Sequence, residues 1–303
     1  TEDPFLFCVH HNDNYPAAKD DLSPNVSLSG RHLGNDFSNK DGWSMYHGQK
    51  VPGFPRHPHR GFETLTVVSK GFIDHADSLG ASARYGDGDA QWLTAGDGIN
   101  HSEMFPLFSQ NGNNKLDFFQ IWLNLPSYNK RVEPNFEMYW EDEIPKISSN
   151  LNGNKNVQVE IITGDYLDFS SPIAPKNSWA NNKKNDVAVW IIRLDSNGNF
   201  AIPNTKSGAK RNLYVLKGSN MEIDGQSISG GSMVTLDSSK NTVIKNLGSK
   251  TKILMLQGVP INEPVVKYGP FVMNTRSEIE QAFYDYNRTE FGGWKWGNSD
   301  PVH

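Results

Sequence analysis

Short runs of β-branched and aromatic residues recur along the chain, and clusters of Gly, Asn, Asp and Pro separate them. Hydrophobic residues at helical spacing are scarce. This pattern is typical of an antiparallel all-β sandwich or barrel, because short strands must be joined by frequent turns. Strands are predicted at residues 64–68, 118–123, 157–163, 187–194, 213–216, 232–236 and 253–256.

One late segment has helical spacing instead. Thr275 and Glu278 stand three positions apart, as the two partners of a capping box do, and hydrophobic residues then recur every three or four positions as far as Tyr286. The pattern predicts a short helix that ends at about Arg288 and serves packing.

The length and the internal pattern indicate two domains. A chain of 303 residues corresponds to two units of about 150 residues each. Residues 144–186 are rich in Asn, Ser, Lys and Pro at both ends. The boundary is therefore expected there, between an N-terminal domain of residues 1–143 and a C-terminal domain of residues 144–303 that includes the helix and the tail. Residues 213–218 also echo residues 65–71, which is compatible with two copies of one barrel.

Composition narrows the classes of function. Hydrophobic residues make up 36% and aromatic residues 11% of the chain, enough for packed cores, and the net charge is -5 without a dense run of Lys or Arg. Direct binding of nucleic acid or of an anionic membrane is therefore not expected. No apolar run reaches the roughly 20 residues of a membrane span, and no secretory signal is visible. With Cys8 as the only cysteine, a reducing compartment is expected, the cytoplasm or, in a eukaryote, the nucleus.

Two short motifs carry the candidate chemistry. His57 and His59 are two positions apart, and so are His101 and Glu103. Positions i and i+2 of an extended strand point to the same face, so each pair can converge on one ion, and the two pairs are expected to face each other across a barrel. A single His-x-His is most often a surface or hydrogen-bonded pair, and it is the second motif that favours a metal.

This set of side chains indicates the kind of ion. Three imidazole nitrogens and one carboxylate oxygen suit a divalent transition metal such as Fe, Mn, Ni, Cu or Zn. Four protein ligands leave two positions of an octahedral ion open, which the binding of a chelating substrate or of dioxygen requires. The motifs therefore predict one mononuclear metal site.

Other side chains are weaker candidates. Glu63 lies four positions after His59, so strand parity puts it on the same inward face. It is either the carboxylate ligand in place of Glu103 or an acceptor that orients a ligating imidazole. His75 is a candidate for the pocket wall, and so is Trp92, although a tryptophan more often belongs to a core. The remaining histidines are expected to be solvated or locally hydrogen-bonded, namely His10, His11, His32, His47 and His303.

The residues around both motifs resemble the pirin family of the cupin superfamily. The closest likeness lies in residues 54–64 and 91–104, which contain the four candidate ligands. The likeness continues at residues 124–126, 161–164, 262–265 and 269–275. The resemblance implies an all-β fold of two antiparallel cupin (jelly-roll) β-barrels with a short C-terminal helix. It also implies one metal in the N-terminal barrel, Fe(II) first, held by His57, His59, His101 and Glu103, with Glu63 beside the ligands.

The C-terminal half lacks these ligands. Aligned with the N-terminal half, it has other residues at the ligand and Glu63 positions, namely Asn204, Lys206, Lys210, Ile244 and Asn246. A charged lysine has no lone pair to give a metal. The second barrel is therefore expected to be metal-free and to serve packing or partner binding.

The resemblance implies two alternative functions. Some bacterial pirins open quercetin in a dioxygenase reaction, which takes a small planar phenolic substrate and dioxygen. Here Glu103, or else Glu63, is the candidate base for the 3-hydroxyl proton. The animal pirin is a nuclear, redox-sensitive co-regulator of a transcription factor, a role in which the metal alters the surface offered to a protein partner. The open metal positions favour the enzyme.

Two segments depart from the simplest family pattern. Residues 10–49 are longer and richer in Asn and Asp, and they are expected to reshape the mouth of the pocket. The tail, residues 291–303, is aromatic and polar without an assignable motif, and it is either a docking arm or a disordered end.

Overall fold

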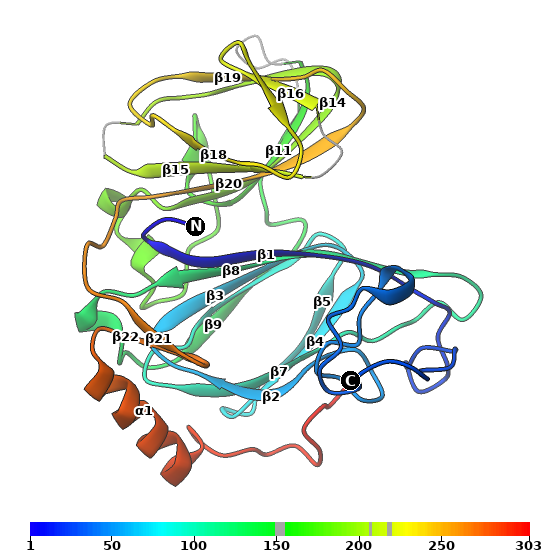
Figure 1. Cartoon of the computed structure of the whole chain (residues 1–303). Helices are drawn as coiled ribbons and strands as arrows, with labels where there is room; N and C mark the ends of the chain where they lie inside the picture. The colour runs from blue at the N-terminus through cyan, green and yellow to red at the C-terminus, as the bar shows by residue number, and fades with distance from the viewer. Residues whose placement is uncertain (149–154, 206–207, 217–219) are drawn as a thin grey trace. The chain divides into compact units, whose positions relative to one another are not determined.

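The computed structural model describes residues 1–148, 155–205, 208–216 and 220–303. Almost all of its regular structure is antiparallel β-strand, with one α-helix near the C-terminus (Figure 1). The all-β class predicted from the pattern of short strands and turns is thereby confirmed.

The chain divides into two compact units, which we call the first and the second barrel. The first barrel comprises Phe7–Glu141 and Glu263–His303. The second barrel comprises Thr1–Leu6 and Asp142–Asn262.

The first barrel contains two sheets, with β1 and β8 in one and β2 and β7 in the other (Figure 1). The five-stranded sheet has the order β1 (Phe5–Tyr15), β8 (Asn114–Asn124), β3 (Phe62–Lys70), β6 (Ala90–Thr94) and β9 (Asn135–Tyr139). The four-stranded sheet has the order β2 (Gly53–His59), β7 (Ile99–Met104), β4 (Phe72–Asp77) and β5 (Ser82–Gly86).

An aromatic cluster anchors the segment 10–49 to the first barrel. Trp43 and Tyr46 from this segment pack with Phe105 and Phe118 from the body of the barrel. Full burial of a side chain such as Phe contributes about 1.5–3 kcal/mol to stability. The segment is therefore held in place by the same hydrophobic effect that holds the strands.

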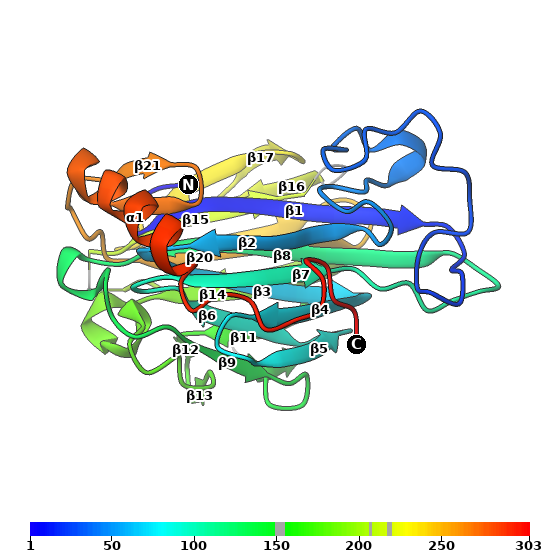
Figure 2. The ribbon, with the colours of Figure 1, turned by 90° about the horizontal axis from the view of Figure 1, so that it is seen from below.

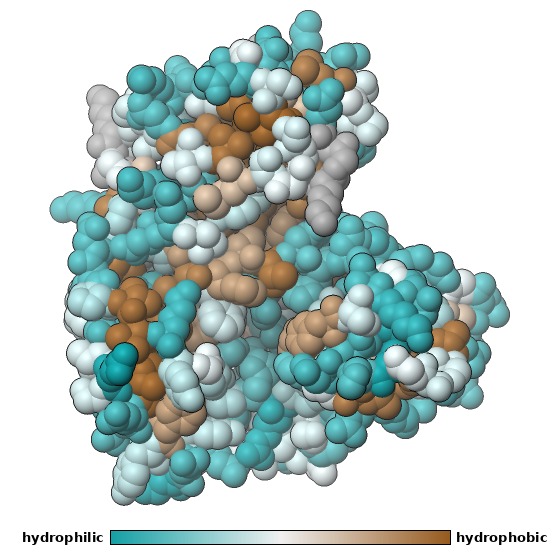
Figure 3. Space-filling model, in the orientation of Figure 1, coloured by the Kyte–Doolittle hydropathy of each residue, from teal (hydrophilic) through white to brown (hydrophobic). Residues whose placement is uncertain are grey.

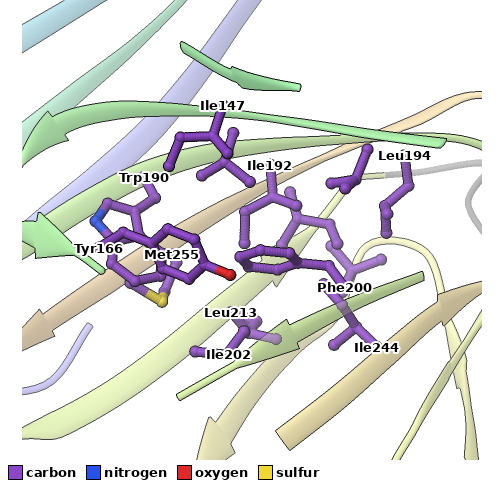
Figure 4. Packing of buried hydrophobic residues seen from close by; sticks show 14 of the residues in the cluster. Ile147, Tyr166, Trp190, Ile192, Leu194, Phe200, Ile202, Leu213, Ile244 and Met255 are labelled. Atoms are coloured by element: carbon purple, nitrogen blue, oxygen red, sulfur yellow. The ribbon is translucent and has the colours of Figure 1, made fainter. Parts of the chain in front are cut away.

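The second barrel is built from one nine-stranded sheet. Its order is β17 (Gln226–Ser229), β16 (Asn220–Ile223), β19 (Thr242–Asn246), β14 (Ala188–Ile202), β20 (Thr251–Gly258), β15 (Lys210–Val215) and β18 (Met233–Leu236), with β11 (Lys155–Thr163) on β14 and β10 (Lys146–Ser148) on β11. The long strand β14 pairs with three neighbours, β11, β19 and β20. The interior is hydrophobic, with Trp190, Phe200, Leu213, Ile244 and Met255 packed together (Figure 4).

The positions aligned with the metal motifs have ordinary structural roles in the second barrel. Ile244 belongs to the hydrophobic core, and Asn246 is buried with its side-chain amide donating to backbone carbonyls such as that of Leu194 on β14. Asn204 and Lys210 are exposed. Two further predicted positions, Lys206 and Gly218 of the internal repeat, lie outside the described residues.

Short elements complete the chain. They are the hairpins β12 (Asp165–Tyr166) with β13 (Phe169–Ser170) and β21 (Val266–Tyr268) with β22 (Phe271–Met273), and the 3-10 helices η1 (Lys40–Gly42), η2 (Ser127–Asn129), η3 (Trp179–Asn181) and η4 (Lys183–Asn185).

Helix α1 (Arg276–Thr289) begins as the sequence predicted. The Thr275 side chain accepts from the backbone N–H of Glu278, and the Glu278 carboxylate accepts from the backbone N–H of Thr275, so both halves of the capping box are present. The helix buries Ile279 and Ala282 against a cluster that includes Phe271. The prediction of a short packing helix is confirmed.

The helix and the tail belong with the first barrel, although the sequence-based division at residue 143 assigned them to the second. Arg60 donates to the helix residue Asp285 at 2.8 Å, and Lys130 donates to the carbonyls of both Gly61 and Val272. The chain thus returns to its first unit after residue 262. The local composition of the sequence does not predict this return.

Among the described residues, no helix is both long and apolar enough to cross a bilayer. The face seen in Figure 3 is mostly hydrophilic, with hydrophobic residues in separate patches.

Candidate metal centre

Three histidines converge on neighbouring strands of the first barrel. Strands β2 and β7 pair antiparallel, and His57 stands directly opposite His101. The ring centroid of His57 lies 4.4 Å from that of His101 and 4.8 Å from that of His59, and the His59 and His101 centroids are 4.9 Å apart. The two motifs therefore lie side by side in one sheet, not across the barrel as the sequence analysis expected.

The free lone pairs of these rings point to a metal. The Nδ1 atoms of His57 and His59 pair with the carbonyls of Pro55 at 2.9 Å and Pro270 at 3.4 Å. A carbonyl only accepts, so each Nδ1 carries the proton and each Nε2 keeps its lone pair. Potential ligand atoms of the three histidines all lie within 4.8 Å of one another.

His101 makes the case for a ligand strongest. Its side chain is fully buried, and neither ring nitrogen has a hydrogen-bond partner among the described residues. Burial lowers the pKa of His57 to about 4 and lowers the pKa values of His59 and His101 well below their ordinary value, so all three imidazoles are neutral at neutral pH. Buried polar atoms without partners are unfavourable. A transition metal fits these residues because it uses the lone pairs that the protein leaves free.

Glu103 stands on β7 two residues after His101, and it lines the cavity beside the histidines. Its carboxylate accepts from Gln120 Nε2 at 2.8 Å and from Thr66 Oγ1 at 3.3 Å. Burial raises the pKa of this carboxyl. The close cluster itself contains the three histidines alone, so a direct bond from Glu103 to the metal remains a proposal.

Glu63 lies on the opposite face of its strand from the metal site, contrary to the sequence-based parity argument. It stands on β3 and accepts from Thr94 Oγ1 at 2.7 Å. Thr66, which donates to Glu103, is three positions away on the same strand and so points to the other face. The parity from His59 fails because the turn at Arg60 and Gly61 ends β2 and starts a strand of the other sheet.

His75 and Trp92 are buried and are not among the cavity-lining residues. His75, on β4, pairs with Asp77 at 3.1 Å, and its ring lies 5.6 Å from that of His101. It therefore packs behind a ligand candidate. Trp92 stands on β6 opposite Leu65, and its role is in the core.

A cavity of about 810 Å³ opens onto the metal cluster. The residues lining it are Phe7, Val9, His11, Gly34, Phe37, His47, Gln49, Phe54, Pro55, Arg56, His57, His59, Glu103, Gln120, Trp122, Ser299 and Asp300. Five of these lie in the segment 10–49, which supports the expectation that this segment shapes the pocket. Two come from the tail.

The tail is an ordered arm on the first barrel. The backbone N–H of Arg56 donates to Ser299 O at 2.7 Å, and Trp296 Nε1 donates to Asp77 O at 2.9 Å. The N–H of His303 donates to Asp74 Oδ2 at 2.7 Å, which ends the chain beside β4 (Figure 2). The sequence left two alternatives for the tail, a docking arm or a disordered end. These contacts are those of an arm docked on the first barrel.

Sequence reasoning missed His11 as a pocket residue. It was expected to be solvated or locally hydrogen-bonded, but it is buried and lines the cavity with Phe7 and Val9 from the same strand. The three residues alternate along β1, so the period of two was the signal that could have identified this wall.

The chain is similar to known proteins along most of its length. It matches the family described as Pirin over residues 3–123 and the Pirin C-terminal cupin domain over residues 189–292. The Vibrio cholerae protein named "Putative quercetin 2,3-dioxygenase" is 34% identical over 248 residues, which are 80% of this chain and 80% of that protein. Human Pirin is 31% identical over 252 residues, which are 82% of this chain and 80% of that protein.

A solved structure with the same fold is that of quercetin 2,3-dioxygenase from Acinetobacter baumannii. It has a TM-score of 0.74 and 28% sequence identity, and the match covers 96% of this chain and 86% of that chain. This match confirms the cupin fold expected from the sequence resemblance.

Proposed function

This chain belongs to the pirin family, and we propose that it is a metal-dependent dioxygenase that opens the ring of a flavonol such as quercetin. His57, His59, His101 and Glu103 are the proposed ligands of one divalent transition metal, with Fe(II) as the first candidate. The names of the relatives support the reaction type. The observation that carries the proposal is the buried His101, whose two ring nitrogens have no partner among the described residues, next to a cavity of substrate size.

The proposed ligands, three histidines and one glutamate, suit a metal that activates a hydroxylated substrate. When bound, the metal supplies a Lewis acid that polarises a substrate hydroxyl and leaves room in its coordination sphere for small ligands. The three neutral imidazoles contribute no charge, so Glu103 is the one anionic group among the proposed ligands.

Glu103 is also the proposed proton acceptor for the flavonol 3-hydroxyl. Its carboxylate lines the cavity and is oriented by Gln120 and Thr66. Glu63, the alternative base, is less suitable because it lies on the other face of β3 and accepts from Thr94. An acceptor must be within hydrogen-bond reach of the proton it takes.

The cavity walls suit a planar aromatic substrate. Phe7, Phe37, Phe54 and Trp122 line the cavity. Aromatic walls bind planar rings and keep bulk water from the reacting atoms. The polar rim residues Gln49 and Asp300 offer hydrogen bonds to hydroxyl groups on such a ring system.

The test is aerobic incubation of the Fe(II)-loaded protein with quercetin. We expect loss of the visible absorbance of quercetin and release of carbon monoxide, abolished by a chelator and restored by Fe(II) or another divalent ion. A Glu103→Gln variant should lose most turnover, whereas Glu63→Gln should retain it.

In the alternative function, the same metal regulates the binding of a protein partner. The family resemblance suggests this role, and human Pirin is among the relatives of this chain. If the metal-loaded protein leaves quercetin and related flavonols intact in air but binds a partner in one iron oxidation state only, the regulatory function replaces the enzyme.

A further inference from the structure

His11 is held at the cavity wall by contacts on several sides of its ring. Its imidazole stacks on Phe118 with centroids 4.5 Å apart and an interplanar angle of 15°. Phe54 meets it edge-on at 6.0 Å, and Nδ1 lies 2.8 Å from Tyr46 Oη. The ring orientation is therefore fixed before any ligand enters.

The hydrogen bonds beyond His11 fix its tautomer. Tyr46 Oη lies 2.8 Å from Asp13 Oδ2, and Asp13 Oδ1 accepts from the N–H of Ser44 at 2.9 Å. A carboxylate can only accept, so the single phenolic proton of Tyr46 goes to Asp13. Tyr46 Oη must then accept from His11 Nδ1–H. The lone pair of neutral His11 is consequently on Nε2.

The Nε2 atom is available to a ligand. Among the described residues, the His11 ring has its hydrogen-bond partner at Nδ1 alone, and His11 lines the cavity that also contains His57, His59 and Glu103. Burial lowers the pKa of His11 to about 4, so the ring is neutral at neutral pH. A neutral acceptor between aromatic walls favours an uncharged O–H donor on a planar ring over a cation or an anion.

We propose that His11 is a substrate-binding residue whose Nε2 accepts a hydrogen bond from a second hydroxyl of a polyhydroxylated planar aromatic compound. This hydroxyl is distinct from the one at the metal, and Tyr46 and Asp13 are positioning residues that hold the tautomer. The identity of the substrate class rests on the proposed function. The direction of the hydrogen bond at His11 rests only on the series of hydrogen bonds from Asp13 through Tyr46 to His11.

The test compares two flavonols in binding experiments without oxygen, so that affinity is separated from turnover. Quercetin has several ring hydroxyls, and 3-hydroxyflavone has only the 3-hydroxyl. With metal-loaded protein, His11→Phe should weaken quercetin binding about tenfold and leave 3-hydroxyflavone binding within about twofold, which corresponds to the loss of one hydrogen bond. Phenylalanine keeps the stacking on Phe118.

His10→Phe is the matched control. His10 is adjacent on β1 and points to the opposite face, where it pairs with Asp117 at 2.9 Å and stacks on Phe119. Both affinities should stay unchanged in this variant. Tyr46→Phe removes only the oxygen that accepts from Nδ1–H, so it should reduce the preference for quercetin without removing the His11 ring.

A spectroscopic measurement tests the positioning role directly. The ¹⁵N shifts of His11 in the zinc-loaded protein, which is diamagnetic, should show the Nδ1–H tautomer in the wild type and a mixture with Nε2–H in Tyr46→Phe. An Nε2–H tautomer in the wild type, or equal losses for both flavonols in His11→Phe, would overturn the inference while leaving the proposed enzyme intact. If metal-loaded wild type binds neither flavonol, the proposed function and this inference both fail.

Discussion

At the scale of single residues, His101 decides whether the first barrel holds a metal. Both of its ring nitrogens are buried without a partner among the described residues. His101→Ala removes one of the three converging imidazoles, and we expect metal affinity to fall about a hundredfold or more. The barrel should stay folded, because its hydrophobic clusters lie elsewhere. Metal content and chelator competition measure the loss, and near-ultraviolet circular dichroism monitors the fold.

Glu63→Gln is the control for this variant. Its carboxylate accepts from Thr94 on the far face of β3, so the amide should leave metal content unchanged. Full metal content in His101→Ala would contradict the three-histidine centre. Loss of metal in Glu63→Gln would instead restore Glu63 as the carboxylate ligand.

A second residue-scale prediction concerns acid stability. The pKa of His11 is lowered by burial to about 4, against about 6.5 in an unfolded chain. Between these values the unfolded chain binds a proton that the folded protein does not, so the free energy of unfolding falls as the pH drops from about 6.5 toward 4. From pH 8 to pH 5, wild type should lose about 2 kcal/mol more than His11→Phe. Urea unfolding of both proteins at each pH measures the difference, and parallel pH profiles would refute it.

Residue spacing predicted part of the site. The i, i+2 rule predicted that His57 and His59 share one face, because it requires only that the local backbone be extended. The second motif of the same spacing then identified His101 as a further ligand candidate. The rule failed for Glu63, where a two-residue turn starts a new strand. His11 was missed because the network of Tyr46 and Asp13 that buries it comes from residues more than thirty positions apart.

At the scale of elements, the turn between β2 and β3 joins the metal motif to the returning C-terminal segment. Gly61 has a φ of +85°, and a Cβ there would lie 2.0 Å from the carbonyl oxygen of Val272. Gly61→Ala should therefore lower the free energy of unfolding by about 3 kcal/mol or more, through both backbone strain and displacement of β22. Urea unfolding measures the change.

Gly42→Ala separates the two causes. Gly42 has nearly the same φ, +84°, but a Cβ there would meet nothing within 4 Å. This variant should lose only about 1–2 kcal/mol, the cost of a left-handed alanine. Equal losses in the two variants would show that the contact with Val272 is unimportant.

Strong local patterns predicted the elements, and mixed ones did not. Each of the seven strands expected from β-branched and aromatic runs overlaps an observed strand, from β3 to β20; four lie wholly inside it, and three extend one residue beyond its end. Helix α1 follows its capping box. Strand β1 was not anticipated, because its polar residues from His10 to Asn14 hide the alternation of Phe7, Val9 and His11. The tail carried no pattern, since it is held by individual hydrogen bonds to β4 and its neighbours.

At the scale of the whole molecule, two barrels of one family have different interiors. In the first barrel, neutral imidazoles stand beside a cavity, whereas in the second, Trp190, Phe200 and Ile244 fill the interior. Sequence comparison of the halves placed Ile244 at the position of His101, and Ile244 lies in the hydrophobic core; the absence of metal from the second barrel stays a prediction. The comparison did not anticipate that residues 263–303 return to the first barrel, since that depends on distant partners such as Lys130 and Val272.

The stoichiometry of metal binding tests this division of roles. In the described part of the second barrel, the hydrophobic Ile244 stands at the position of His101. Asn204 and Lys210, both exposed, stand at the positions of His57 and Glu63. Metal-loaded protein, after removal of loosely bound ions, should therefore contain about one equivalent per chain, because among the described residues converging lone pairs occur in the first barrel alone. Elemental analysis of wild type beside His101→Ala separates the two barrels: the variant should approach zero. Two equivalents in the wild type, with one remaining in the variant, would place a second metal site outside the first barrel's histidine cluster.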